Sequence, residues 1–182
     1  MTTPRLTPSG RRHILSLMTN ETAQATIDFL LPELRQEYKI TRKLLAAVPA
    51  ETCSYKPSEK CMSGLELASH IALSETFFLR GAIQGKFEWK EQEFGNPAAV
   101  LAYYDAEVPG LLERLAQVPA GKLAQPIEFH TWNLPAVNYI ALDLKHGIHH
   151  RGQLSAYLRP MGARVPSIYG PTADDIVETA SA

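Results

Sequence analysis

The chain has 182 residues, of which 45% are hydrophobic, and its formal net charge is -1. This length fits one domain of ordinary size, and the near-neutral charge gives no concentrated basic face, so we expect no nucleic-acid partner. The sequence contains no apolar run of the roughly 18 to 20 residues that span a bilayer, and no convincing signal peptide. It therefore predicts a cytoplasmic protein without a membrane partner.

Residues 1–21 are polar, and we expect them to form a flexible N-terminal tail before a single domain over residues 22–182. The first helix is predicted over residues 26–48, where apolar residues recur at steps of three and four. Pro32 lies inside this pattern. Because proline is tolerated best in the first turn of a helix, the regular helix would begin near Leu31.

The second helix is predicted to begin after Ser63. The segment Ser63-Gly-Leu-Glu66 has the pattern of a capping box, in which the serine and glutamate side chains satisfy each other's free backbone amides. The helix would continue to about Gln84, and Gly85 is a suitable residue to end it.

The remaining chain predicts two further long helices. An asparagine–proline pair starts the third, over residues 96–117, and a break is expected at Pro109. Residues 118–134 are expected to be irregular or weakly extended, and the fourth helix covers residues 133–159. The segment 165–174 is rich in proline and glycine and predicts an ordered, extended tail. Four long amphipathic helices in one domain favour a four-helix bundle.

Three histidines in the fourth helix carry the clearest indication of chemistry. His146 and His150 are four residues apart, so on a helix their imidazoles lie one above the other, about 6 Å apart. Two such rings can hold one divalent metal ion, and a third ligand would leave positions open for water or substrate. His149 points away from this pair and is expected to be solvated.

His70 is the candidate third ligand. Helical spacing places it at the edge of the apolar stripe of the second helix, where it could face the fourth helix. A lone histidine at the rim of a core is more often a hydrogen-bonded structural residue, and this alternative stays open. Arg151 falls near the apolar stripe of the fourth helix, and a structural ion pair with a carboxylate is the favoured interpretation.

Four other residues are candidates for positions behind the ligands or beside a substrate. Tyr139, Asp143 and Gln153 share the polar-aromatic face of the fourth helix with the histidine pair. Asp143 lies one turn before His146 and could accept a hydrogen bond from its second ring nitrogen. His130 lies in the connection before the fourth helix, where it could line the site or close it as a fourth ligand.

Several sharper motifs are absent from the sequence. It has no H-E-x-x-H, no G-x-S-x-G and no P-loop, and it lacks the paired Glu-x-x-His motifs of di-iron bundles. Cys53 and Cys61 are too far apart for a zinc ribbon and are expected to be reduced thiols.

Two segments resemble a known family. The segment His146-Gly-Ile-His-His-Arg-Gly-Gln-Leu-Ser-Ala-Tyr-Leu-Arg159, followed by Val165-Pro-Ser-Ile-Tyr-Gly-Pro-Thr-Ala-Asp174, resembles the C-terminal signature of the DinB/YfiT-like superfamily of metalloenzymes. The segment from Lys56 to His70 resembles the start of that family's second helix. The resemblance implies an all-α four-helix bundle in up-down-down-up order with a long crossover. It also implies homodimers and a mononuclear metal site at His70, His146 and His150.

The resemblance and the histidine pattern together predict a metal-dependent enzyme acting on a small-molecule substrate. Relatives in this superfamily include S-transferases and isomerases that use low-molecular-weight thiols, and some hydrolases, so a thiol is the expected partner. Zinc is the first choice of metal, with nickel, iron, manganese or copper as alternatives. The rival hypothesis is a non-catalytic, metal-stabilised stress-related or interaction protein whose ion joins two helices.

Overall fold

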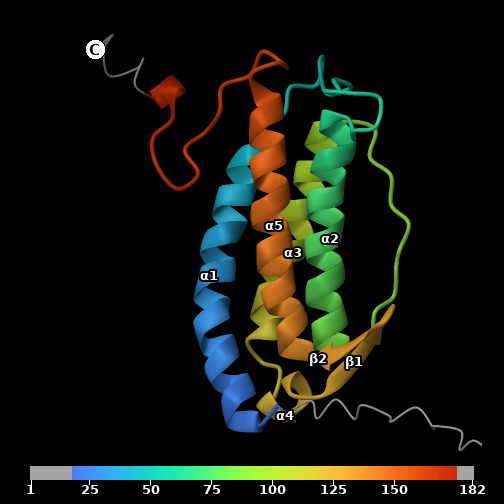
Figure 1. Ribbon diagram of the computed structural model, residues 1–182. Helices are drawn as coiled ribbons and strands as arrows, with labels where there is room; N and C mark the ends of the chain where they lie inside the picture. Colours follow the sequence, from blue (N-terminus) through green and yellow to red (C-terminus); the bar gives the residue numbers. More distant parts are fainter. Residues whose placement is uncertain (1–17, 176–182) are drawn as a thin grey trace, which may run out of the picture.

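The computed structural model describes residues 18–175 and is an all-α helical bundle with one small hairpin (Figure 1). The fold class predicted from the sequence is therefore confirmed. The elements are α1 (Asn20–Ala46), α2 (Gly64–Gln84), α3 (Pro97–Leu115), α4 (Ala120–Leu123), β1 (Pro126–Phe129), β2 (Trp132–Pro135) and α5 (Ala136–Leu158).

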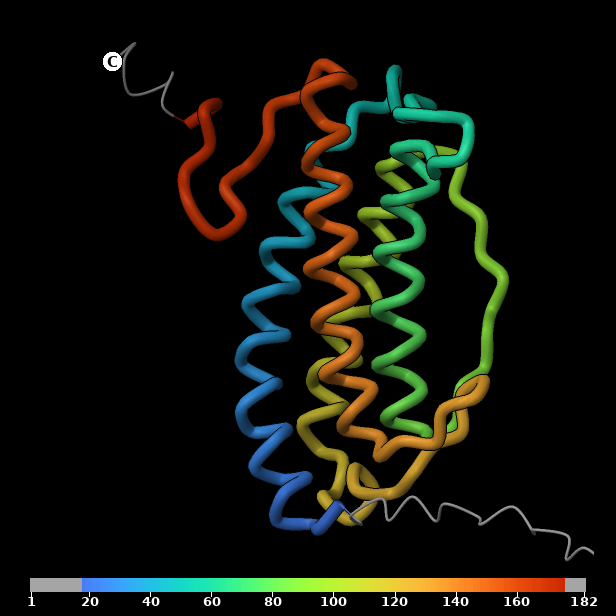
Figure 2. Tube along the Cα trace, in the orientation of Figure 1, coloured from blue at the N-terminus to red at the C-terminus, as the bar shows by residue number. Residues whose placement is uncertain are grey.

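The four long helices follow the predicted up-down-down-up order. In the view of Figure 1, α1 and α5 run upward, whereas α2 and α3 both run downward. Residues 85–96 make the long crossover that this order requires, and Figure 2 shows them running along the outside of the bundle from one end to the other. Helix α2 packs against α3 and α5, and α1 packs against the same two helices from the opposite side.

Helix α2 begins and ends where the sequence predicts. The Ser63 side chain accepts a hydrogen bond from the amide of Glu66, and the Glu66 carboxylate accepts one from the amide of Ser63. Gly85 ends the helix in the left-handed region, at φ 82°, which a residue with a Cβ adopts only with strain. These local contacts fix the register of α2 and hence the direction in which His70 points.

Helix α1 is longer than predicted, because it begins at Asn20 rather than near residue 26 or 31. Thr19 caps it by accepting a hydrogen bond from the amide of Thr22, and the first turns bury Ala23 and Ile27 against the core. This packing outweighs the single backbone hydrogen bond that Pro32 removes inside the helix. The expected flexible tail is therefore wrong for residues 18–21, and residues 1–17 lie outside the described part.

The predicted break in the third helix is also wrong. Pro109 lies inside an uninterrupted α3, between buried Val108 and the buried pair Leu111 and Leu112. Residues 118–134 are more regular than predicted, because they form α4 and then the antiparallel β1–β2 hairpin, with Ile127 opposite Leu134. Buried Leu123 and Ile127 attach this connection to the common core of the bundle.

The buried face of α5 differs from the predicted apolar stripe. Helical spacing places Ile148 on the apolar stripe of α5, yet it is 41% exposed, whereas Asp143 and Arg151 are each only 2% exposed. Arg151 forms the predicted structural ion pair: its guanidinium donates to the Glu37 carboxylate of α1 and, at 2.8 Å, to the Thr41 hydroxyl. With Arg151 bound to α1 on one side of α5, His146 and His150 face His70 of α2 on another.

The C-terminal segment is tied to the same ion pair. The Tyr169 hydroxyl accepts a hydrogen bond from Arg151 at 2.7 Å and donates one to the Glu37 carboxylate at 2.8 Å. Asp174 accepts hydrogen bonds from the Val165 amide and from a surface arginine. Within residues 18–175, no helix combines the length and the apolar character that crossing a bilayer requires.

Gly81 permits a close contact between α2 and the crossover. A Cβ atom at this position would lie 2.1 Å from the Phe87 ring, which is itself packed against Phe77, Phe129 and Tyr139 at centroid distances of 5.0, 4.9 and 4.8 Å. The ring therefore has little freedom to move aside.

We expect Gly81→Ala to lower the free energy of unfolding by about 1–3 kcal/mol, because the added methyl group overpacks this contact. Urea unfolding followed by circular dichroism would measure the effect. Gly152→Ala is the matched control, since nothing lies within 4 Å of a Cβ there and alanine favours the helix. Equal stability of the two variants would show that the Phe87 contact does not constrain α2.

Candidate metal centre

The packing of α2 against α5 brings three imidazole rings together at the surface of the bundle. His70 comes from α2, and His146 and His150 come from successive turns of α5. The Nε2 atom of His70 lies 3.2 Å from that of His146 and 3.1 Å from that of His150, and the latter two are 3.1 Å apart. The three rings, all half-buried, thus direct one nitrogen each toward a common point.

The surroundings favour the neutral form of all three rings. Burial, reinforced by the neighbouring imidazoles, lowers the pKa of His146 to about 4. Burial is also the main reason that the pKa values of His70 and His150 are lowered, with a further contribution from the nearby histidines. Neutral imidazole is the form that binds a metal ion, so the site is competent as a ligand set at neutral pH.

Gln153 lies directly behind one of the rings. Its Oε1 atom is 2.7 Å from Nδ1 of His150, and because an amide oxygen can only accept, the histidine must donate from Nδ1. The lone pair of His150 is then on Nε2, the atom that faces the other two rings. A contact of this kind fixes the tautomer and the orientation of a metal ligand.

The structure does not bring Asp143 to the histidines. Its carboxyl is buried in the core, and no hydrogen bond links it to His146 in the described chain. It lies instead near Glu75, whose Oε2 accepts a hydrogen bond from the Tyr104 hydroxyl at 2.6 Å. The sequence placed Asp143 beside the pair from helical angles alone, and the rotation of α5 by its core contacts turned it inward.

The other two candidates, Tyr139 and His130, make their contacts away from the histidine cluster. Tyr139 is fully buried, and its hydroxyl donates to the backbone carbonyl of Ile127, which ties α5 to the hairpin. His130 is exposed at the tip of the hairpin with φ 51°, and its ring packs on Phe129. The close histidine cluster contains His70, His146 and His150 but not His130.

An aromatic cluster beside the rings was missed at the level of sequence. Phe78 contacts His146 at a centroid distance of 5.9 Å, and Phe77 packs against Phe78, Phe129 and Trp89. The adjacent phenylalanines in α2 hinted at such a cluster. The residues from the crossover and the hairpin carried no periodic signal, because they reach the site only through the tertiary fold.

A cavity of about 400 Å³ opens beside His70, between α2 and the crossover. Its lining residues are Leu65, Glu66, Ser69, His70, Leu73, Trp89, Gln92, Glu93 and Phe94. A second, larger cavity of about 900 Å³ lies between the hairpin and α5, and none of the three clustered histidines lines it. A molecule bound in the first cavity would therefore contact His70, one member of the histidine cluster.

The fold and the converging rings define a class of protein, the helical bundles with a three-histidine cluster between two helices. The chain belongs to the DinB family, whose sequence profile matches residues 18–179. This family assignment confirms the resemblance found in the sequence.

Individual relatives agree with the assignment. The chain is 29% identical to the uncharacterized protein YjoA of Bacillus subtilis (strain 168) over 127 residues, which cover 68% of this chain and 82% of YjoA. It is 22% identical to the uncharacterized protein YrdA of the same organism over 154 residues, covering 82% of this chain and 92% of YrdA.

Two crystal structures of DinB-like proteins share the fold. YjoA from Bacillus subtilis superposes with a TM-score of 0.65 at 23% identity, over 79% of this chain and 99% of that one. A DinB-like protein from Bacillus cereus ATCC 10987 superposes with a TM-score of 0.68 at 22% identity, over 79% and 97%.

The buried carboxyls generate a prediction about pH and stability. Burial raises the pKa of Glu75 from 4.5 to about 7, and burial together with Glu75 raises that of Asp143 well above 3.8. The contribution of these two carboxyls to stability is therefore fully present below their unfolded-state pKa values, and it is lost as the pH rises from about 4 through 7.

We expect the unfolding free energy of the unmodified protein to fall between pH 5 and pH 8. In Asp143→Asn this fall should be smaller by about 1–3 kcal/mol, because the substitution removes one buried titrating group. Urea unfolding at the two pH values, with a chelator present, would measure this. Asp28→Asn, the same change at an exposed site of α1, is the control. An equal pH dependence in both variants would contradict the proposed role of the buried carboxyls.

Proposed function

We propose that this chain is a metal-dependent enzyme in which His70, His146 and His150 hold one divalent ion. The observation that carries the proposal is the convergence of three Nε2 atoms within 3.2 Å of one another, with no fourth His, Cys, Asp or Glu donor in the cluster among residues 18–175. Three protein ligands with an open position are typical of catalytic zinc sites, whereas structural sites are closed by four.

The donor set fits such an ion. Two nitrogen ligands of a tetrahedral zinc ion are separated by about 3.3 Å, since each lies at about 2.0–2.1 Å from the metal. The observed separations of 3.1–3.2 Å are close to this value. Three imidazoles also suit nickel, iron or copper, so zinc is the first expectation among several, with manganese a further alternative.

A divalent ion in this position would supply Lewis acidity, which lowers the pKa of a coordinated water or thiol. The residues of the chain would have separate tasks around it. The three imidazoles bind the ion, and Gln153 holds His150 in the tautomer that can do so. Phe78 packs edge-on against His146 and would cover one side of the cluster, with Phe77 behind it.

We propose small-molecule chemistry at this site, with a low-molecular-weight thiol as the expected nucleophile and S-transfer as the expected reaction. Hydrolysis and isomerisation are related reactions that the same ligand set could support. The chemical support is that a thiol loses its proton readily beside a divalent cation and becomes a strong nucleophile. Screening metal-loaded protein with several thiols and electrophiles would identify the reaction.

A non-catalytic role is the second candidate, because the ligands come from two helices and an ion would join α2 to α5. Both roles predict a higher midpoint of thermal unfolding with metal than with chelator. They differ in solvent access: a catalytic site keeps an exchangeable water at the ion, which proton relaxation measurements on manganese- or copper-loaded protein would detect.

Metal content gives the most direct test. Protein purified without an affinity tag should contain about one divalent ion per chain by elemental analysis, and His146→Ala should reduce this to background, because two imidazoles no longer complete the ligand set. His149→Ala is the matched control, since this neighbour is exposed and outside the cluster. Full metal content in the His146→Ala protein would refute the proposed ligand set.

Gln153 should affect affinity without being a ligand. We expect Gln153→Ala to weaken metal binding by about 10- to 100-fold, because His150 loses the contact that fixes its tautomer. Competition titration with a chromophoric chelator would measure this, and Gln153→Glu, which keeps an acceptor, should retain most of the affinity. Unchanged affinity in the alanine variant would show that Gln153 does not position His150.

A further inference from the structure

We propose that the cavity between α2 and the crossover binds the neutral, aromatic part of a substrate, and that Trp89 contacts it directly. This inference rests on the proposed function, because a molecule held here would lie beside His70, one of the three proposed metal ligands. Binding in the cavity does not itself require the metal, so the two proposals can be tested separately.

The size of the cavity favours an organic ligand. At about 400 Å³ it falls within the range of roughly 300–1,000 Å³ typical of small-molecule sites. Its inner surface is largely apolar, with Leu73, Trp89 and Phe94 among the lining residues, and His70 lies on its border. The cavity therefore offers an apolar binding surface that borders His70, one of the proposed metal ligands.

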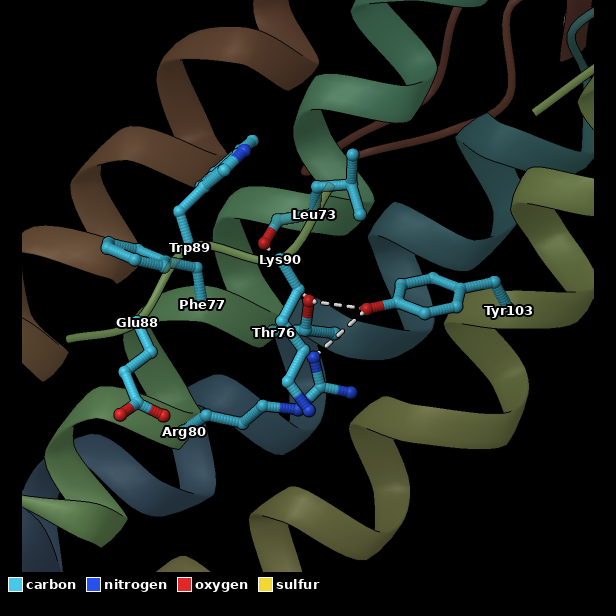
Figure 3. A pocket seen from close by; sticks show the side chains of 8 residues that line it. All are labelled: Leu73, Thr76, Phe77, Arg80, Glu88, Trp89, Lys90 and Tyr103. Atoms are coloured by element: carbon cyan, nitrogen blue, oxygen red, sulfur yellow. Dashed lines mark hydrogen bonds between the residues drawn. The ribbon is translucent and has the colours of Figure 1, made fainter. Parts of the chain in front are cut away.

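Trp89 is held so that one side of its indole stays available. Its ring packs against Phe77 in an edge arrangement at 5.6 Å, yet 59% of the residue is exposed. Figure 3 shows Trp89 and Phe77 next to each other, away from the hydrogen-bonded group of Arg80 and Tyr103. An aromatic ligand could pack against the exposed side of the indole, and such ring pairs contribute affinity beyond the buried area.

The other end of the crossover is anchored in the same way. Phe94 packs against Tyr103 of α3 at a centroid distance of 5.2 Å, while Phe87 lies against Gly81 of α2. Aromatic contacts at both ends thus hold the crossover beside α2 and maintain the cavity wall. The binding site is therefore preformed, and its residues do not have to become ordered when a ligand binds.

The charges near the cavity favour a neutral ligand. Glu66 is paired with Lys56 at 3.1 Å, and Glu88, farther along the crossover, is paired with Lys86 at 2.6 Å. Glu93, the other charged residue that lines the cavity, is exposed to solvent. The lining contains no lysine or arginine to attract an anion, and its two carboxylates are either paired or solvated, which leaves little field to attract a cation.

Neighbouring hollows are less suitable. The pocket drawn in Figure 3 has room for little more than one water, at about 20 Å³, and its Arg80 already donates to Glu107 and Tyr103. The larger cavity beside the hairpin is lined by Trp132, which is 48% exposed, but by none of the three histidines. Trp132 therefore provides a matched control for Trp89.

The experiment is a fluorescence titration with N-phenyl-1-naphthylamine, a neutral aromatic dye, in chelator-treated full-length protein. We expect one dye per chain, with Kd raised about three- to tenfold in Trp89→Ala and unchanged in Trp132→Ala. Trp89→Phe should retain most of the affinity, because it keeps a ring on Phe77. The dye's sulfonated analogue, 8-anilinonaphthalene-1-sulfonate, should bind more weakly and with less dependence on Trp89.

Three results would overturn the proposal: no saturable binding of the neutral dye, loss of affinity in Trp132→Ala rather than Trp89→Ala, or tighter Trp89-dependent binding of the sulfonated dye. Unfolding midpoints of the variants would separate a lost contact from a lost fold, and Trp89→Phe tests the ring itself if Trp89→Ala is unstable. Because chelator is present, failure of dye binding leaves the metal-content result untouched, and the reverse also holds.

Discussion

The contact between α2 and α5 is the constraint on which the rest of the structure depends. One helix supplies a single imidazole and the other supplies two, so the cluster exists only while the helices keep their register and rotation. The register of α2 is set locally by the Ser63 capping box and by Gly85. On its opposite side, α5 is held to α1 by the ion pair between Arg151 and the carboxylate of Glu37. The histidine cluster at the surface is thus held by contacts that extend across the bundle.

The polar groups in the core serve this positioning at some energetic cost. The Arg151 guanidinium donates hydrogen bonds to the hydroxyls of Thr41 and Tyr169. Its Nε atom and one carboxylate oxygen of Asp143 have no hydrogen-bond partner among residues 18–175. Burying such groups is unfavourable relative to apolar packing, yet directional contacts specify one arrangement where apolar side chains permit several. We interpret the network as a device for orienting α5, which has to present two histidines and a glutamine on one face.

The long crossover has a consequence for the site. Because α2 and α3 run in the same direction, residues 85–96 must return along the outside of the bundle (Figure 2). Phe87 and Trp89 bring aromatic rings to the side of α2 that carries His70, and the hairpin adds Phe129 from another direction. The topology thereby places aromatic side chains beside the histidine cluster, on the side of α2 that the crossover and the hairpin cover.

Signals confined to one or two helical turns determined part of this protein from the sequence alone. The capping box of α2, its terminal glycine and the spacing of His146 and His150 each depend on neighbours within a few residues, and all appear where expected. Other features depended on distant partners. Pro32 and Pro109 did not end their helices because core packing compensates for them. Asp143 lies near Glu75 rather than beside the histidines because α5 packs this side against the core. The partners of His70 and the place of Trp89 were likewise decided only by the tertiary structure, since helical periodicity fixes the face of a residue but not the element that packs against it.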